Sequence, residues 1–178
     1  MLIAALFALP LLASYLAFFV WRPEGRLNYG DLLEVRPLAG IPLRQLDGRT
    51  FRFAELHGKW VMVSIDGGAC ARSCEAKLFM MRQQRLMQGR EMDRLERVFL
   101  VEDDAPLSTM LPREIDGTRV LRASDSPLLN AFPAQSARRD HIYLVDPRGN
   151  LRMRFPEVPD PQRMKKDIER LFKAQGAA

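Results

Sequence analysis

The stretch WVMVSIDGGACARSCEAKL, residues 60–78, joins a strand-like run to a helix-like run and contains both cysteines of the chain. Residues 60–65 are almost continuously apolar and rich in β-branched side chains, which predicts a buried central strand. Gly67 and Gly68 allow the backbone to turn sharply after that strand. The residues that follow Cys74 have helical periodicity. A strand, a tight turn with two cysteines and a helix are therefore expected here.

The rest of the pattern predicts strands that alternate with helices. Residues 41–53 alternate around an Asp-Gly pair at 47 and 48, which is typical of a β-hairpin with a two-residue turn. Further strands are expected at 98–101, 119–123, 141–145 and 151–155, and a final amphipathic helix after the N-cap Asp160. This order predicts an α/β fold with a mixed sheet.

The N-terminal segment, residues 2–21, is apolar and carries no charged side chain. A helix of this length is ~30 Å long, the thickness of the hydrocarbon layer of a bilayer, so we predict a membrane anchor over residues 1–21. A cleaved signal peptide is the alternative, but the run ends in bulky residues rather than in a small-x-small cleavage site. Residues 22–36 are predicted to form a linker and residues 37–178 the folded domain.

The orientation in the membrane is inferred from two opposing patterns. Arg22 and Arg26 follow the apolar run and no basic residue precedes it, which would keep the domain in the cytoplasm. Large domains, however, translocate largely regardless of flanking charge, and a cysteine pair is most useful outside the reducing cytosol. We therefore expect a single-pass protein of a bacterial inner membrane, anchored in the lipid bilayer through residues 2–21, with its domain in the periplasm.

The charge pattern disfavours nucleic acid as a partner. The chain has a net charge of +5, but its basic residues are interspersed with acidic ones, as on solvated helix faces. No basic motif interleaved with aromatic residues is present. Nucleic-acid binding is therefore not expected.

Cys70 and Cys74 lie four residues apart, at the start of the predicted helix. The positive end of the helix dipole and the neighbouring Arg72 would stabilise a thiolate there. This spacing places the two side chains ~6 Å apart, which suits a disulfide after a small adjustment and also suits two thiolates that hold a soft ion such as Cu(I). A disulfide at this spacing closes a very small loop and stabilises the fold little, so a structural crosslink is the less favoured interpretation.

Two histidines and two acidic residues are further candidates for the site. His57 precedes the central strand and is interpreted as a solvated loop residue. His141 begins a strand that could lie beside the one leading to the cysteines, so it is a candidate third copper ligand, with a simple hydrogen-bonded histidine as the alternative. Asp103 and Asp104 are interpreted as caps of a loop, and the alternative is that they line the same end of the sheet as Cys70.

Four segments together match a known pattern: LDGRTFRFAELHGKWVMVSI (46–65), CARSC (70–74), VFLVEDDAP (98–106) and DHIYLVDPRGNLRMRFP (140–156). They resemble the Sco/SenC family of thioredoxin-like, membrane-anchored proteins involved in cytochrome c oxidase assembly. The resemblance covers about residues 37–175. It implies a thioredoxin-like mixed sheet flanked by helices, with an N-terminal β-hairpin. It also implies copper binding by Cys70, Cys74 and a downstream histidine, or a role as a thiol–disulfide reductant.

The sequence departs from the family pattern near the histidine. Asp140 and His141 directly precede the predicted strand, so an ungapped match places Arg138 at the ligand position, and an offset of three residues in a strand reverses the face. In addition, the proline that follows the first cysteine in the family is Ala71 here. The chain is therefore interpreted as a divergent Sco-like protein.

Three functions follow from these observations. The leading one is an assembly factor for cytochrome c oxidase that binds Cu(I) through Cys70, Cys74 and His141 and delivers it or prepares the copper site. Its partner would be the copper-site subunit of the oxidase or another assembly factor. The second is an enzyme, a membrane-tethered thiol–disulfide oxidoreductase in which Cys70 attacks and Cys74 resolves. The third is a membrane-tethered, non-catalytic interaction module in which the two cysteines are vestigial.

Overall fold

A mixed β-sheet forms the centre of the structure, a computed structural model that describes residues 15, 28–108, 115–134 and 136–176. The eight strands within these residues lie in the order β1-β8-β7-β4-β5-β6-β2-β3. Their bounds are Asp31–Pro37 (β1), Leu43–Gln45 (β2), Thr50–Phe51 (β3), Trp60–Asp66 (β4), Leu95–Val101 (β5), Arg119–Arg122 (β6), His141–Val145 (β7) and Asn150–Pro156 (β8). The pairs β4–β5 and β5–β6 are parallel and the other pairs are antiparallel.

Strand β4 is the predicted central strand, and all seven of its residues are buried. It lies between the parallel neighbour β5 and the antiparallel neighbour β7. A strand covered on both faces needs apolar side chains in both directions, which explains its nearly continuous apolar run. The prediction for residues 60–65 is confirmed.

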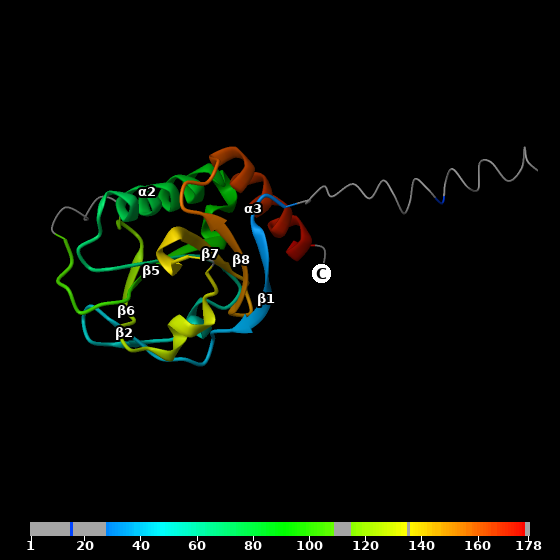
Figure 1. Cartoon of the computed structure of the whole chain (residues 1–178). Helices are drawn as coiled ribbons and strands as arrows, with labels where there is room; N and C mark the ends of the chain where they lie inside the picture. The colour runs from blue at the N-terminus through cyan, green and yellow to red at the C-terminus, as the bar shows by residue number, and fades with distance from the viewer. Residues whose placement is uncertain (1–14, 16–27, 109–114, 135, 177–178) are drawn as a thin grey trace, which may run out of the picture.

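The two faces of the sheet are covered by different elements. Two helices, α2 (Arg72–Met87) and α3 (Pro161–Gly176), lie together on one face (Figure 1). On the other face, apolar side chains of the sheet, including those of its end strands β2 and β3, pack with the short helices η1 (Phe53–Leu56) and η3 (Pro127–Ala131). Along β4, Met62 belongs to the cluster on the helix side, whereas Val63 belongs to the opposite cluster. The alternation of a strand therefore decides to which face each side chain belongs.

The hairpin and the N-cap are confirmed, but the hairpin loop has three residues, 46–48, and not the two that the Asp-Gly pair predicts. The hairpin turn has Gly48 at φ +83°, and the amide of Gln45 donates to the carbonyl of Arg49 at 2.8 Å. The carboxylate of Asp160 accepts a hydrogen bond from the amide of Arg163 at 2.7 Å, as an N-cap does at the start of α3. These signals are local in the chain, which is why the sequence displays them.

The beginning of the folded domain differs from the prediction. The linker expected over residues 22–36 ends earlier, because Asp31–Pro37 forms β1 and pairs with β8 at the edge of the sheet. The buried carboxylate of Asp167 on α3 accepts hydrogen bonds from the amides of Tyr29 and Gly30, at 2.7 and 2.9 Å. These contacts, which join residues far apart in the chain, hold the start of β1 on the domain.

The predicted membrane anchor, residues 2–21, lies outside the described residues apart from Tyr15. No helix in the part of the chain that the structure describes is long and apolar enough to span a bilayer. The anchor, its orientation and the periplasmic location therefore stay predictions.

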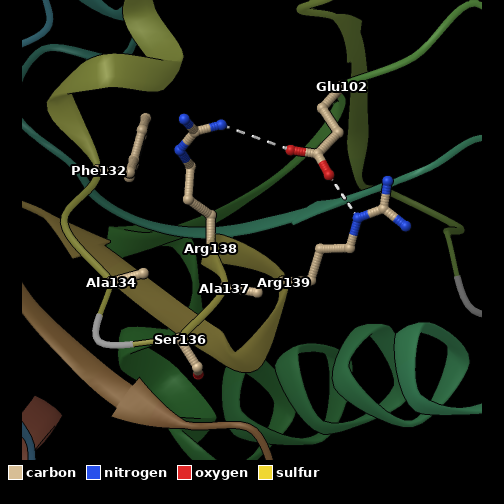
Figure 2. Close-up of a pocket in the computed structure, with 7 residues that line it drawn as sticks. All are labelled: Glu102, Phe132, Ala134, Ser136, Ala137, Arg138 and Arg139. Atoms are coloured by element: carbon tan, nitrogen blue, oxygen red, sulfur yellow. Dashed lines mark hydrogen bonds and ion pairs between the residues drawn. The ribbon is translucent and has the colours of Figure 1, made fainter.

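The connection between β6 and β7 reaches the carboxyl-terminal end of the parallel strands. Its last part is the short helix η4, Arg138–Asp140. Figure 2 shows Arg138 and Arg139 extending from this helix toward Glu102, which directly follows β5. The β6–β7 connection thus brings basic side chains to the edge from which the cysteine turn leaves β4.

Candidate functional site

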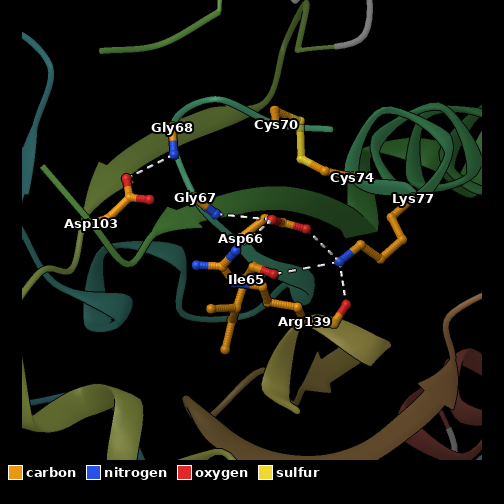
Figure 3. Close-up of a disulfide and its surroundings, with 9 residues drawn as sticks. All are labelled: Ile65, Asp66, Gly67, Gly68, Cys70, Cys74, Lys77, Asp103 and Arg139. Carbon is orange, nitrogen blue, oxygen red and sulfur yellow. Dashed lines mark hydrogen bonds and ion pairs between the residues drawn. A yellow bond between two sulfur atoms is a disulfide. The ribbon is translucent and has the colours of Figure 1, made fainter. Parts of the chain in front are cut away.

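Cys70 and Cys74 form a disulfide between the turn after β4 and the first turn of α2 (Figure 3). The helix begins at Arg72 with Ala71 as its N-cap, and the Cα atoms of the cysteines are 5.2 Å apart. The helix start stabilises negative charge, so it would favour the thiolate form of the reduced pair. The predicted proximity of the two cysteines is confirmed.

The backbone of Cys70 has an unusual conformation. Its φ angle is +39°, in the left-handed region that favours glycine. The amide of Cys70 donates to the carbonyl of Gly67 at 3.1 Å, which closes the tight turn after β4. Strained backbone of this kind costs of the order of 1–3 kcal/mol and occurs most often at functional sites. The turn therefore positions the cysteine at an energetic cost.

The disulfide is almost completely covered. Cys70 is 4% exposed and Cys74 is fully buried. The segment after β5 lies against the cysteine turn, since Asp103 accepts a hydrogen bond from the amide of Gly68 at 2.8 Å and the amide of Ser108 donates to the carbonyl of Gly68 at 3.0 Å. The segment after β5 is therefore fastened to the turn that leads to Cys70, the more exposed cysteine.

Asp103 accordingly has both of the roles that the sequence left open. It caps its own loop, because Oδ1 also accepts a hydrogen bond from the amide of Ala105 at 3.2 Å. It also lies at the same end of the sheet as Cys70 and holds the cysteine turn through Gly68. Asp104 instead accepts a hydrogen bond from the hydroxyl of Ser124.

The contact at Gly68 leads to a prediction. A Cβ atom at this position would lie 2.4 Å from the carbonyl oxygen of Ala105, which is backbone and cannot rotate away. We expect Gly68→Ala to lower the free energy of unfolding by about 1–3 kcal/mol, as overpacking does, and to expose the disulfide to faster reduction. Thermal unfolding and the rate of reduction by dithiothreitol measure the two effects.

Gly40→Ala is the matched control, because a Cβ atom added at Gly40 would have no neighbour within 4 Å and the φ angle of this residue is not positive. An unchanged melting temperature together with an unchanged reduction rate in Gly68→Ala would contradict the role of this contact.

His141 lies on the opposite face of the sheet from the cysteines. Its ring makes an edge contact with Tyr143, at 5.8 Å between centroids, and Tyr143 belongs to the core cluster away from α2. Both cysteines belong to the cluster on the α2 side. Nδ1 of His141 lies 3.2 Å from the carbonyl oxygen of Phe155, and burial lowers the pKa of the imidazole. The histidine thus packs at the start of β7 and is not brought to the sulfur atoms.

The three predicted copper ligands are therefore not assembled in this structure. Within the described ranges, no group of three or more His, Cys, Asp or Glu side chains could hold a metal ion. His57 is exposed in the loop before β4, as expected. The two thiols of a reduced Cys70–Cys74 pair match the preference of Cu(I) for soft ligands, whereas the third predicted ligand does not fit.

A buried ion pair that was not predicted from the sequence lies beside the cysteines. Nζ of Lys77 on α2 lies 2.9 Å from Oδ2 of Asp66 at the end of β4, and their side chains are 1% and 9% exposed. The ammonium group also donates to the carbonyls of Ile65 and Arg139 (Figure 3). The pair therefore connects the cysteine helix, the central strand and η4. The sequence does indicate that Lys77 has a buried partner, because it lies three residues after Cys74, on the buried side of the helix.

The guanidinium of Arg139 extends this network toward β5. Its Nε donates to Glu102, and its Nη1 lies 3.7 Å from Oδ1 of Asp66. The hydrogen bond to Glu102 raises the pKa of Arg139, so the group stays charged. The carboxyl-terminal ends of β4 and β5 are thus joined by charged side chains beneath the cysteine turn.

The fold is shared with known redox and copper proteins. Yeast Sco1 with copper bound has a TM-score of 0.63 and 18% identity over 78% of this chain and 94% of that chain. Bradyrhizobium japonicum ScoI with copper bound has a TM-score of 0.54 and 18% identity over 75% of this chain and 99% of that chain. The thioredoxin domain of a Bacteroides vulgatus thiol–disulfide oxidoreductase has a TM-score of 0.55 and 14% identity over 80% of this chain and 96% of that chain.

The resemblance to Sco/SenC proteins is confirmed at the level of the fold, as is the thioredoxin-like sheet. No curated protein matches the sequence. A family model described as "Transmembrane-like, thioredoxin-like, C-terminal domain" matches residues 60–175, from the first residue of β4 to the last turn of α3. Since this match covers more than half of the chain, the protein belongs to the transmembrane-like, thioredoxin-like C-terminal domain family.

Proposed function

We propose that this protein is a thiol–disulfide oxidoreductase that acts on a partner protein through Cys70 and Cys74. The observation that carries the proposal is the disulfide between the turn after β4 and the first turn of α2. The positive φ angle of Cys70 and its slight exposure, compared with the fully buried Cys74, support Cys70 as the cysteine that a partner contacts.

The proposed exchange takes two steps. In the reduced form, the thiolate of Cys70 attacks one sulfur of a partner disulfide, breaks that bond and releases the other sulfur as a thiolate. Cys74 then loses its proton and attacks the sulfur of Cys70, which forms the Cys70–Cys74 disulfide and releases the second partner thiolate. The partner gains two electrons and the cysteine pair loses them. The structure corresponds to the oxidised product of this exchange.

The test is an exchange measurement on the full chain. After reduction, the protein is equilibrated with glutathione buffers of different ratio and the free thiols are counted by alkylation. We expect a midpoint within the range of known oxidoreductases, roughly −120 to −270 mV. A pair that neither exchanges with glutathione nor reduces a disulfide-containing substrate overturns the proposal.

Copper binding is the second candidate, favoured by the proximity of the two cysteines, 5.2 Å between Cα atoms, and by the copper-bound Sco neighbours. As a copper-binding protein, the chain would be a Sco-like assembly factor for cytochrome c oxidase. We propose that it is tethered through residues 2–21 with its domain in the periplasm, because disulfides persist in oxidising compartments. The cargo would be held by two thiolates without the imidazole of His141.

This arrangement predicts that His141→Ala changes the Cu(I) affinity of the reduced chain less than about twofold, since the imidazole lies on the opposite face of the sheet. Titration against a competing Cu(I) chelator measures the affinity, and Cys74→Ser is the variant expected to lose it. A large loss of affinity in His141→Ala would show that the histidine reaches the metal after all.

A further inference from the structure

A hollow of about 440 Å³ lies where the β6–β7 connection meets the end of β5 (Figure 2). One part of its wall is built from small or apolar side chains, and the other part carries two guanidinium groups and one carboxylate. The lining residues are Glu102, Phe132, Ala134, Ser136, Ala137, Arg138 and Arg139. The exchange reaction proposed above does not use these residues.

The two guanidinium groups of the hollow share the carboxylate of Glu102 unequally. Glu102 accepts a hydrogen bond from Arg139, whose guanidinium also lies near Asp66. Arg138 has a weaker partner, since its Nη1 is 3.8 Å from the other oxygen of Glu102, beyond hydrogen-bond distance. The side chain of Arg138 is 38% exposed, and Figure 2 shows it between Glu102 and Phe132. Arg139 is held by its hydrogen bond to Glu102 and its proximity to Asp66. Among the described residues no side-chain hydrogen bond holds Arg138, so its guanidinium is the group in the hollow that is freer to turn to a ligand.

The hollow adjoins the cysteine turn. A Cβ atom at Gly67 would lie 3.5 Å from Nη2 of Arg139, and the carbonyl of Gly67 accepts the hydrogen bond from the amide of Cys70. An extended polypeptide advances about 3.3 Å per residue. A partner segment that places its sulfur at Cys70 can extend from this turn past Arg139 into the hollow, whose other wall, Phe132, packs against Tyr143 on the far face of the sheet.

We propose that Arg138 recognises a carboxylate on the partner, so that the preferred substrates are polypeptides with an acidic side chain a few residues from the reactive cysteine. This inference rests on the proposed exchange reaction and specifies its substrate class. A guanidinium binds a carboxylate through two parallel hydrogen bonds. The wall of Phe132, Ala134 and Ala137 would pack against the aliphatic part of that side chain.

The experiment compares peptide disulfides that differ in one residue. The reduced full chain is mixed with peptides that carry Glu at two, four or six residues from the attacked cysteine, or Gln at the same position, and the rate is followed by quenching and chromatography. We expect the best Glu peptide to react about tenfold faster than its Gln twin, the effect of one good charge-assisted hydrogen bond. The preference should shrink as salt is added.

The variants separate recognition from general charge effects. Arg138→Gln should bring the Glu-to-Gln rate ratio close to one, and Arg138→Lys should keep part of it. Arg90→Gln removes the same charge from an exposed residue beyond the far end of α2 and should leave the ratio unchanged. A ratio that stays high in Arg138→Gln, or one near unity for every peptide in the wild type, overturns the inference.

A neutral disulfide, oxidised dithiothreitol, distinguishes the two possible failures. If the chain exchanges with it while showing no preference among the peptides, the exchange reaction stands and the carboxylate site fails. If the chain exchanges with neither oxidised dithiothreitol nor the peptides, the proposed function itself fails.

Discussion

A Cys70→Ser variant will not exchange disulfides with any substrate, and Cys74→Ser will accumulate a mixed disulfide between Cys70 and its partner. The reason is the arrangement at the start of α2, where Cys70 precedes the helix and Cys74 lies fully buried in its first turn. Without Cys70 no sulfur is left to meet the partner, whereas without Cys74 the first step proceeds and the second cannot. Non-reducing gel electrophoresis and mass spectrometry detect the trapped species.

The opposite behaviour would reverse the assignment. If Cys70→Ser traps the partner and Cys74→Ser does not, the buried cysteine is the attacking one and must become exposed during the exchange. A double variant that lacks both cysteines is the control, because it tests whether any residual exchange comes from a contaminating protein.

Lys77→Met is expected to lower the free energy of unfolding by about 3–5 kcal/mol. The substitution keeps most of the volume of the side chain but removes the cation that is hydrogen-bonded to Asp66, which leaves only the guanidinium of Arg139, 3.7 Å from Oδ1. Breaking a buried pair in this way is strongly destabilising. For a domain of this size the loss corresponds to a fall in melting temperature of roughly 10 °C. Thermal unfolding of the full chain, followed by near-ultraviolet circular dichroism, measures it.

Two further variants give this prediction its control. Asp66→Asn combined with Lys77→Met removes both charges and should recover much of the lost stability, because replacing a buried pair as a whole is often nearly neutral. Lys165→Met breaks the more exposed pair with Glu169 on α3 and should cost well under about 1 kcal/mol. A Lys77→Met variant as stable as Lys165→Met would show that the buried pair contributes little.

The features predicted well are those whose signal is local in the chain. The apolar run at 60–65, the Asp-Gly turn at 47 and 48 and the N-cap Asp160 each depend on residues within one or two turns. The spacing of Cys70 and Cys74 at a helix start is local too, so their proximity could be predicted from the sequence.

The features that the sequence pattern misses or misplaces depend on contacts between distant segments. Strand β1, apart from Pro37, falls within the predicted linker, because its place at the sheet edge depends on Asp167, 137 residues beyond Gly30 in the chain. The ion pair of Lys77 is missed, although a charged residue on the buried side of a helix is an indication of such a partner. The hollow at Arg138 forms only where the β6–β7 connection meets the end of β5.

The sequence by itself determined the strand, turn and helix that carry the cysteines, and it determined that Cys70 and Cys74 meet, because all of this follows from short-range periodicity and spacing. Only the tertiary structure decided which groups surround them. The alternation of β7 places His141 beside Tyr143 on the far face, and the sheet order brings Asp66, Lys77 and Arg139 under the cysteine turn. The physical reason is that each side chain of a strand points to one face of the sheet. The groups that it meets on that face come from other segments, which only the fold brings there.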